Sequence, residues 1–264
     1  MAMVVAALIS MSISSTASEP VLLHAAGSLR APLTEVVKTF AADTGLQVQP
    51  KFGASGLLKD EILSGAPAGV FASANLEHPK ALAQAKRAGP VVLFARNKLC
   101  ALVRPDLVVD PATLLDRMLD SNVKLGTSTP RADPSGDYAW EVFRKADALR
   151  PGAFSKLEQK ALQLTGGPGT KAAPTGRSLY GTLVADGSAD IFLTYCTNAV
   201  AARRDDRGLQ VVALPEVLRV SADYGLTVVS TASPDAYRFA LFILSEIGQQ
   251  ILANHGFAVP SSPH

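Results

Sequence analysis

Short apolar runs alternate with amphipathic segments along most of the chain, and this alternation constrains the fold more than any other feature of the sequence. The predicted strands are Val21–Ala25, Leu46–Phe52, Gly69–Ser73, Lys98–Val103, Val123–Gly126, Asp190–Cys196 and Tyr224–Ser230. The predicted helices are Leu29–Asp43, Gly56–Ser64, Pro111–Asp120, Asp137–Leu149, Leu179–Ala185 and Asp235–Leu252. Strands that alternate with helices in this way predict an α/β fold with a largely parallel sheet.

The composition limits the classes of protein that this chain can belong to. Of 264 residues, 48% are hydrophobic and 18% are charged, which is enough to bury a large core and excludes intrinsic disorder. A formal net charge of +2 and an aromatic content of 6% argue against a nucleic-acid-binding surface. The length is compatible with one or two domains.

The first 18 residues predict an export signal. Met1–Ser18 has no charged side chain, and the apolar run Val4–Ile9 is followed by small polar residues. The run is too short to span a bilayer, and Ser15-Thr16-Ala17 is typical of a signal cleavage site. No Lys or Arg precedes the apolar run, so a misassigned start or a disordered tail is the alternative.

Three junctions between a predicted strand and helix share a small-residue turn with a serine. They are Gly27-Ser28-Leu29, Ala54-Ser55-Gly56 and Pro134-Ser135-Gly136. A helix N-terminus has backbone N–H groups without partners and a partial positive charge, so helix ends that converge on one cleft would bind an anion. The alternative is that each serine only caps its helix.

Several stretches of the chain resemble the molybdate-binding proteins of ABC importers, over about residues 21–260. The most specific of them is Gly65–Ala74 (GAPAGVFASA). The others are His24–Leu29 (HAAGSL), Lys51–Gly56 (KFGASG), Asp133–Gly136 (DPSG) and Asp190–Tyr195 (DIFLTY). The chain departs from the family pattern in four places: Gly69 stands where Asp is usual, Ser135 where Ala is common, Arg177 has no counterpart, and Tyr195-Cys196-Thr197-Asn198 differs from the commonest pattern.

The resemblance implies a type II periplasmic binding fold, with two α/β lobes joined by a two-stranded hinge that closes on a tetrahedral oxyanion. We expect residues 19–96 and 224–264 to form the first lobe and residues 97–223 the second. The ligand contacts that it implies are Ser28, Ser55, the backbone near Ser135, the hydroxyl of Tyr195, and a backbone donor near Arg177 or Ser178. Arg177 has no counterpart in a charge-free site, so it is either a ligand contact or a solvent-facing loop residue.

The implied function is capture of molybdate or tungstate outside the cytoplasm and delivery to an ABC permease in the membrane. We expect a periplasmic monomer that is not an enzyme and has no cofactor, metal cation or nucleic-acid partner. Every oxygen of molybdate is an acceptor, so the expected site has uncharged donors and no carboxylate. Such a site rejects a protonated phosphate, which needs an acceptor, but sulfate remains an alternative ligand.

The two cysteines leave two questions open. Cys100 and Cys196 either form a disulfide or remain two buried thiols. A nucleophilic Cys196 would indicate an enzyme on the same fold, although no His lies close to it in the sequence. A ligand-sensing regulatory domain is the third alternative, but the chain has no helix-turn-helix module. His24, directly before the first serine turn, is expected to be a core histidine.

Overall fold

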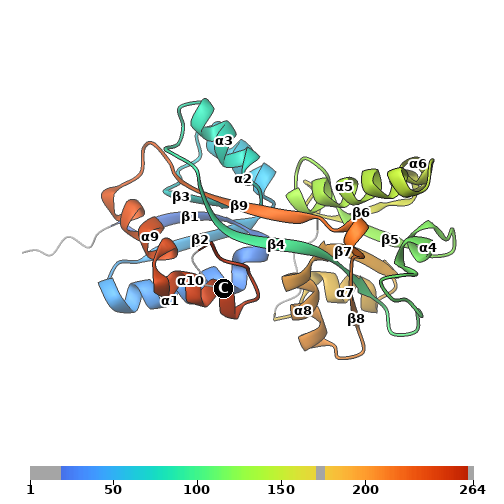
Figure 1. Ribbon diagram of the computed structural model, residues 1–264. Helices are drawn as coiled ribbons and strands as arrows, with labels where there is room; N and C mark the ends of the chain where they lie inside the picture. The colour runs from blue at the N-terminus through green and yellow to red at the C-terminus, as the bar shows by residue number, and fades with distance from the viewer. Residues whose placement is uncertain (1–18, 171–175, 261–264) are drawn as a thin grey trace, which may run out of the picture.

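The computed structural model describes residues 19–170 and 176–260. The predicted leader, residues 1–18, lies outside the described residues. Two α/β lobes lie side by side, and two long strands, β4 (Val92–Val103) and β9 (Ser221–Val228), extend from one to the other (Figure 1).

The first lobe has a sheet of three short strands, to which β9 adds a fourth strand. The strand β1 (Val21–Ala26) pairs in parallel with both β2 (Val48–Gly53) and β3 (Val70–Ser73), and β9 pairs antiparallel with β3. The helical segments of this lobe are η1 (Gly27–Leu29), α1 (Arg30–Thr44), α2 (Ser55–Leu63), α3 (Glu77–Gln84), α9 (Pro234–Leu244) and α10 (Glu246–Asn254).

The second lobe repeats this plan. Its strands are β5 (Leu125–Ser128), β6 (Leu162–Thr165), β7 (Ile191–Tyr195) and β8 (Gln210–Ala213). The strand β5 is parallel to β6 and β7, whereas β4 is antiparallel to β7 and β8. The helical segments are α4 (Leu114–Leu119), α5 (Pro134–Leu149), α6 (Ala153–Lys160), α7 (Leu179–Ala185), α8 (Cys196–Asp205) and η2 (Glu216–Leu218).

The strand order across the molecule is β2-β1-β3-β9-β4-β7-β5-β6, with β8 paired to β4. The strands β4 and β9 are antiparallel and lie next to each other at the centre of this order. The predicted α/β fold and the two lobes joined by a pair of hinge strands are therefore confirmed. The exact lobe boundaries, 19–96 with 224–264 and 97–223, stay a prediction.

Several predicted elements differ from those observed, and the C-terminal helix differs most. Asp235–Leu252 is two helices, because the backbone at Ser245 is extended (φ −68°, ψ 165°). The Ser245 hydroxyl donates to the carbonyl of Phe242 and accepts from the N–H of Gly248, so it ends one helix and caps the next. Ile247, in the first turn of the second helix, is 53% exposed.

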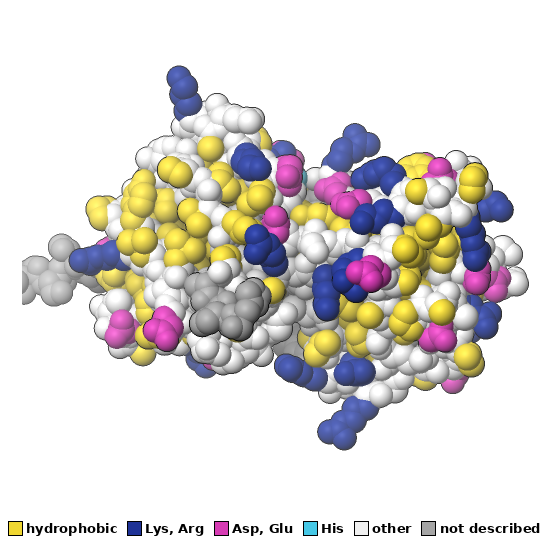
Figure 2. All heavy atoms as spheres, viewed as in Figure 1, with side chains coloured by type: hydrophobic (Ala, Val, Ile, Leu, Met, Phe, Trp, Pro, Cys, Tyr) yellow, Lys and Arg dark blue, Asp and Glu magenta, His cyan; other side chains and the backbone are white. Residues whose placement is uncertain are grey.

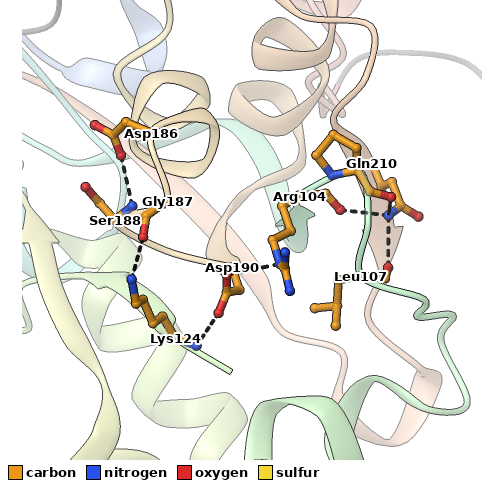
Figure 3. A network of polar contacts seen from close by, with 9 residues as sticks. Arg104, Leu107, Lys124, Asp186, Gly187, Ser188, Asp190 and Gln210 are labelled. Atoms are coloured by element: carbon orange, nitrogen blue, oxygen red, sulfur yellow. Dashed lines mark hydrogen bonds and ion pairs between the residues drawn. The ribbon is translucent and has the colours of Figure 1, made fainter. Parts of the chain in front are cut away.

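Asp190 contacts neighbouring strands at the end of the second lobe that lies away from the first lobe. Its carboxylate accepts from the N–H of Lys124 and pairs with Arg104, while Gln210 donates to carbonyls in the turn after β4 (Figure 3). These contacts join the ends of β4, β5, β7 and β8.

On the face drawn in Figure 2, acidic and basic side chains are mixed over both lobes. None of the helices in the described part of the chain is long and apolar enough to cross a membrane.

Candidate functional site

A cavity of about 660 Å³ lies between the two lobes and is lined by residues of both. The structure brings four of the five predicted site residues to it: Ser28, Ser55, Arg177 and Tyr195. They come from distant parts of the chain, because η1 and α2 follow strands of the first lobe while α7 and β7 belong to the second. The fifth, Ser135, is fully buried and is not among the lining residues.

Ser28 connects the cavity to the hinge strands. Its hydroxyl is 2.9 Å from the hydroxyl of Tyr224, which is fully buried on β9. The side-chain amide of Asn97, on β4, donates to Tyr224 over 3.5 Å and to the hydroxyl of Thr197 over 2.9 Å. Thr197 lies on α8 and also lines the cavity. A hydrogen-bonded chain therefore runs from one wall of the cavity, through both hinge strands, to the other wall.

Ser55 is the first residue of α2 and is 1% exposed. Its hydroxyl accepts a hydrogen bond from the N–H of Ala74, the residue after β3, over 3.1 Å. This bond fixes the position of the hydroxyl and links the starts of two loops that face the second lobe. Ser55 is thus a rigid part of the first-lobe wall.

Tyr195 ends β7 and is 2% exposed, yet it lines the cavity. Its hydroxyl is buried and has no hydrogen-bond partner among the described residues. Burial and the neighbouring Tyr224 raise the pKa of this hydroxyl well above its usual value, so it remains protonated and can donate. A buried donor without a partner costs free energy, which a bound acceptor would recover.

The start of α5 differs from the expected site because a carboxylate occupies it. Asp133 is the N-cap of α5, and its side chain accepts from the backbone N–H of Ser135 over 3.0 Å. Asp133 lines the cavity, as does Asp205. The cavity therefore contains two carboxylates that the expected donor-only site does not have, and the N–H of Ser135, expected near the ligand, donates to Asp133 in this structure.

Arginine side chains also line the cavity, and sequence reasoning missed all but Arg177. Arg30 lies over the ring of Phe52 at 4.8 Å from its centroid, and Arg204 is exposed on α8. Arg177 is exposed at the cavity, before α7. His255 lines the cavity as well, and its ring is 2.9 Å from Glu35. The one signal available in the sequence was for Arg30, which directly follows the first serine turn.

Direct contacts join the lobes beside the cavity. The N–H of Gly56, on α2, donates to the carbonyl of Ala132, before α5, over 2.8 Å. The hydroxyl of Tyr138, on α5, lies 3.4 Å from the carbonyl of Ala74. The structure is therefore a closed arrangement, in which the two lobes touch at the edge of the cavity.

The question about the cysteines is answered in favour of a disulfide. Cys100 on β4 and Cys196 at the start of α8 are bonded, with Cα atoms 4.8 Å apart and a sequence separation of 96. Cys196 directly follows Tyr195, so the bond attaches the Tyr195 segment to a hinge strand. Since Cys196 is bonded, it has no free thiol for nucleophilic chemistry.

The remaining titratable groups do not form a metal centre. Within residues 19–170 and 176–260, no group of three or more His, Cys, Asp or Glu side chains is placed to hold a metal ion. His24 is buried on β1, and burial together with Lys51 lowers its pKa.

The cavity has room for a small anion with water, or for an organic molecule, because its volume of about 660 Å³ falls within the roughly 300–1,000 Å³ that ligand pockets span.

Comparison with known proteins shows the family. The model of the family described as bacterial extracellular solute-binding protein matches residues 21–258. An uncharacterised protein of Pasteurella multocida is 34% identical, over 88% of this chain and 96% of its own length. The molybdate-binding protein ModA of Escherichia coli is 26% identical, over 90% of this chain and 88% of its own.

Solved structures share the fold at lower identity. The periplasmic molybdate-binding protein of Azotobacter vinelandii superposes with a TM-score of 0.72 at 20% identity, over 91% of this chain and 100% of its own. The sulfate-binding protein SubI of Mycobacterium tuberculosis superposes with a TM-score of 0.75 at 20% identity, over 92% of this chain and 88% of its own. The resemblance noted in the sequence is confirmed, and the family consists of binding proteins rather than enzymes. The chain belongs to the bacterial extracellular solute-binding proteins.

Proposed function

We propose that this solute-binding protein captures a tetrahedral oxyanion between its lobes, outside the cytoplasm, and delivers it to an ABC importer. The observation that supports this most is the Tyr195 hydroxyl, a buried donor without a protein partner at a cavity lined from both lobes. Ser28, Ser55 and Arg177 add hydroxyl and guanidinium donors to the same space. Residues 1–18 would act as the export signal, and the mature protein would be a monomer that docks on a permease.

Molybdate or tungstate is the first candidate ligand, because a molybdate-binding protein is a relative over most of both chains. Sulfate is the second candidate, because a sulfate-binding protein has a closely similar fold. Both are tetrahedral acceptors that hydroxyl donors would hold, and Arg177 would add a charge-assisted bond. The role of Ser135 stays a prediction, since Asp133 forms the cavity wall beside it.

A thermal-shift panel of oxyanions tests this proposal on the purified mature chain. A ligand that binds only the folded state stabilises it by RT ln(1 + [L]/Kd), which is about 2.7 kcal/mol at one hundred times Kd. We expect at least one tetrahedral oxyanion to raise the melting temperature in a saturable manner, and chloride at the same ionic strength to leave it unchanged. If no oxyanion raises it, the proposal is wrong.

A further inference from the structure

Asp133 places a negative charge in the wall of the cavity at the start of α5. The residue has an extended backbone (φ −125°, ψ 120°), and Pro134 follows it as the first residue of the helix. One carboxylate oxygen, Oδ1, accepts from the N–H of Ser135, and the carbonyl oxygen of Asp133 accepts from the N–H of Gly136 over 2.8 Å. The first free N–H groups of the helix are thus satisfied from within the protein.

The loop after β6 packs closely against the carboxyl group. Gly166 has a φ of +77°, and a Cβ atom added to it would lie 2.7 Å from Oδ2 of Asp133, so no side chain fits there beside this oxygen. Gly166 lines the same cavity. Because Oδ1 is bonded to the N–H of Ser135, the carboxyl group is positioned by the protein and is not a mobile surface charge.

A residue that lines the same cavity has a buried donor without a partner. The hydroxyl of Tyr195 is unpaired among the described residues, and the charge on Asp133 contributes to the raised pKa of both Tyr195 and Tyr180. The three groups are therefore within electrostatic reach of one another. The residues that line the cavity combine hydroxyl and guanidinium donors with the acceptor at Asp133.

This combination has a chemical consequence for the ligand. A bare dianion has only acceptor oxygens, so it is repelled by an ionised carboxylate and cannot hydrogen-bond to it. An oxyanion that also has an O–H group donates to the carboxylate while its other oxygens accept from Ser28, Ser55 and Tyr195. A site built to bond a hydroxyl discriminates strongly against an analogue without one, because its buried group is then left unpaired.

We propose that Asp133 is a specificity-determining residue that selects, at neutral pH, a tetrahedral oxyanion bearing a hydroxyl group over a bare dianion such as molybdate. The inference rests on the proposed function, because it assigns the ligand class of the same cavity. Within oxyanion capture it ranks a hydroxyl-bearing oxyanion above molybdate and sulfate, the two candidates that the relatives alone suggest. The hydroxyl belongs either to the anion itself, as in monohydrogen phosphate, or to an organic body attached to it, as in glycerol 3-phosphate.

The protonation state of Asp133 gives the inference a second readout. Burial raises the pKa of its carboxyl to about 6, although the Ser135 N–H and the Ser128 hydroxyl lower it. Only the protonated form donates to a bare dianion, so molybdate binding takes up a proton and weakens as the pH rises above about 6. Between pH 5.5 and pH 7.5 this loss is about twentyfold for one group with that pKa.

Other groups near Asp133 also titrate or bear charge, so the slope has to be assigned by substitution. Asp137 lies on the same helix, and its charge raises the pKa of Asp133 further. The charged and titratable side chains that line the cavity from other elements are Arg30, Arg177, Tyr180, Tyr195, Arg204, Asp205 and His255. A slope that disappears on substitution of Asp133 alone belongs to that carboxyl.

The test compares the mature chain with Asp133→Asn by calorimetric titration with molybdate, inorganic phosphate and glycerol 3-phosphate. Asn is an equally good N-cap, so α5 is retained, while its amide offers a donor to the cavity in place of an acceptor. Asp133→Ser, also a good cap, is the second variant. Asp186→Asn is the charge-matched control, because Asp186 accepts from the N–H of Ser188 and does not line the cavity.

We expect Asp133→Asn to bind molybdate about tenfold or more tightly than the wild type at pH 7.5, and to lose the dependence on pH. The same variant should bind the preferred phosphate compound about tenfold or more weakly. Inorganic phosphate and glycerol 3-phosphate, compared in the wild type, identify which source supplies the hydroxyl. Asp186→Asn should match the wild type with all three compounds.

Two results would overturn the inference, and they can be told apart. Equal molybdate affinity in wild type and Asp133→Asn, without a pH slope, removes Asp133 from ligand selection and leaves oxyanion capture standing. Absence of binding by all three anions to every folded variant, verified by circular dichroism, removes the proposed function as well.

Discussion

Two buried hydroxyl groups in the cavity differ in what holds them, and their removal should therefore have different effects. The Ser55 hydroxyl accepts from the N–H of Ala74, whereas the Tyr195 hydroxyl has no partner among the described residues. Tyr195→Phe should leave the free energy of unfolding unchanged or slightly higher, because no internal bond is lost. Ser55→Ala should lower it by about 1–3 kcal/mol, since the Ala74 N–H loses its acceptor.

Both substitutions should weaken ligand binding by about 1–3 kcal/mol, because each removes a donor that the bound anion would use. Urea denaturation of the unliganded variants measures stability, and calorimetric titration with the oxyanion that the wild type binds measures affinity. Tyr195→Phe is the more decisive variant, because an affinity loss without a stability loss separates binding from folding. Unchanged affinity in Tyr195→Phe would exclude its hydroxyl from the site.

The residue scale also shows where sequence reasoning ends. The positions of Ser28, Ser55 and Tyr195 at the cavity could be predicted from short motifs, whereas Arg177 stands in none of them and was left open. Asp133 was missed although it stands in the Asp133–Gly136 motif. Asp and Ser are both favoured N-caps, so the motif alone allowed either residue to cap the helix. Pro134 was the available signal, because proline favours the first helical position and so makes the preceding residue the cap.

Among the elements, β4 and the start of α8 are joined by the Cys100–Cys196 disulfide. We expect this bond to contribute measurably to the stability of the folded chain. The two cysteines are 96 residues apart, so the bond restricts a long loop of the unfolded chain. Cys100→Ala combined with Cys196→Ala should lower the free energy of unfolding by about 2–4 kcal/mol.

Urea unfolding with and without a reductant tests this contribution. The wild type should shift to lower urea when reduced, and the double variant should unfold at the same urea concentration under both conditions. Coincident transitions of oxidised and reduced wild type would show that the bond contributes nothing to the stability of the folded chain.

Most of the helices and strands could be predicted from the sequence, but the positions of many of their ends could not. The helix Leu179–Ala185 has both of its predicted ends, and the parallel strands of the first lobe lie where apolar runs predicted them. The strand β4 begins at Val92 rather than Lys98, because its first half pairs with β9, which is remote in sequence. The break at Ser245 depends on a local cap whose signal is hidden within a continuous apolar periodicity.

At the scale of the whole molecule, closure of the lobes depends on a glycine at their contact. The N–H of Gly56 bonds the carbonyl of Ala132, and a Cβ atom at Gly56 would lie 2.6 Å from that carbonyl oxygen. Gly56→Ala should therefore favour an open arrangement and weaken ligand binding by about tenfold or more, because only a small fraction of the molecules would remain competent to bind.

Small-angle X-ray scattering with saturating ligand measures this effect. The wild type should become more compact on binding, and Gly56→Ala should compact less. Gly89→Ala is the matched control, since a Cβ atom there would meet its nearest neighbour at 3.7 Å, an ordinary contact. Equal compaction and affinity in Gly56→Ala would show that this contact does not limit closure.

The two-lobed architecture itself was predicted from a resemblance, since strand order cannot be derived from local patterns. The strand β9, near the end of the chain, lies between β3 and β4, and no local feature of residues 221–228 indicates these neighbours. Such long-range pairing is decided by the fit of complete surfaces rather than by residue propensity.

The position of β9 also fixes the order in which the molecule can be completed. During synthesis or translocation the N-terminal segments emerge first. The pairing of β3 with β9, and the contact of α1 with α10, form only when the C-terminal residues have emerged. The segment between β4 and β9 is continuous and can assemble earlier. A chain that lacks β9 therefore leaves the sheet of the first lobe incomplete, and β4 without its neighbour in the hinge.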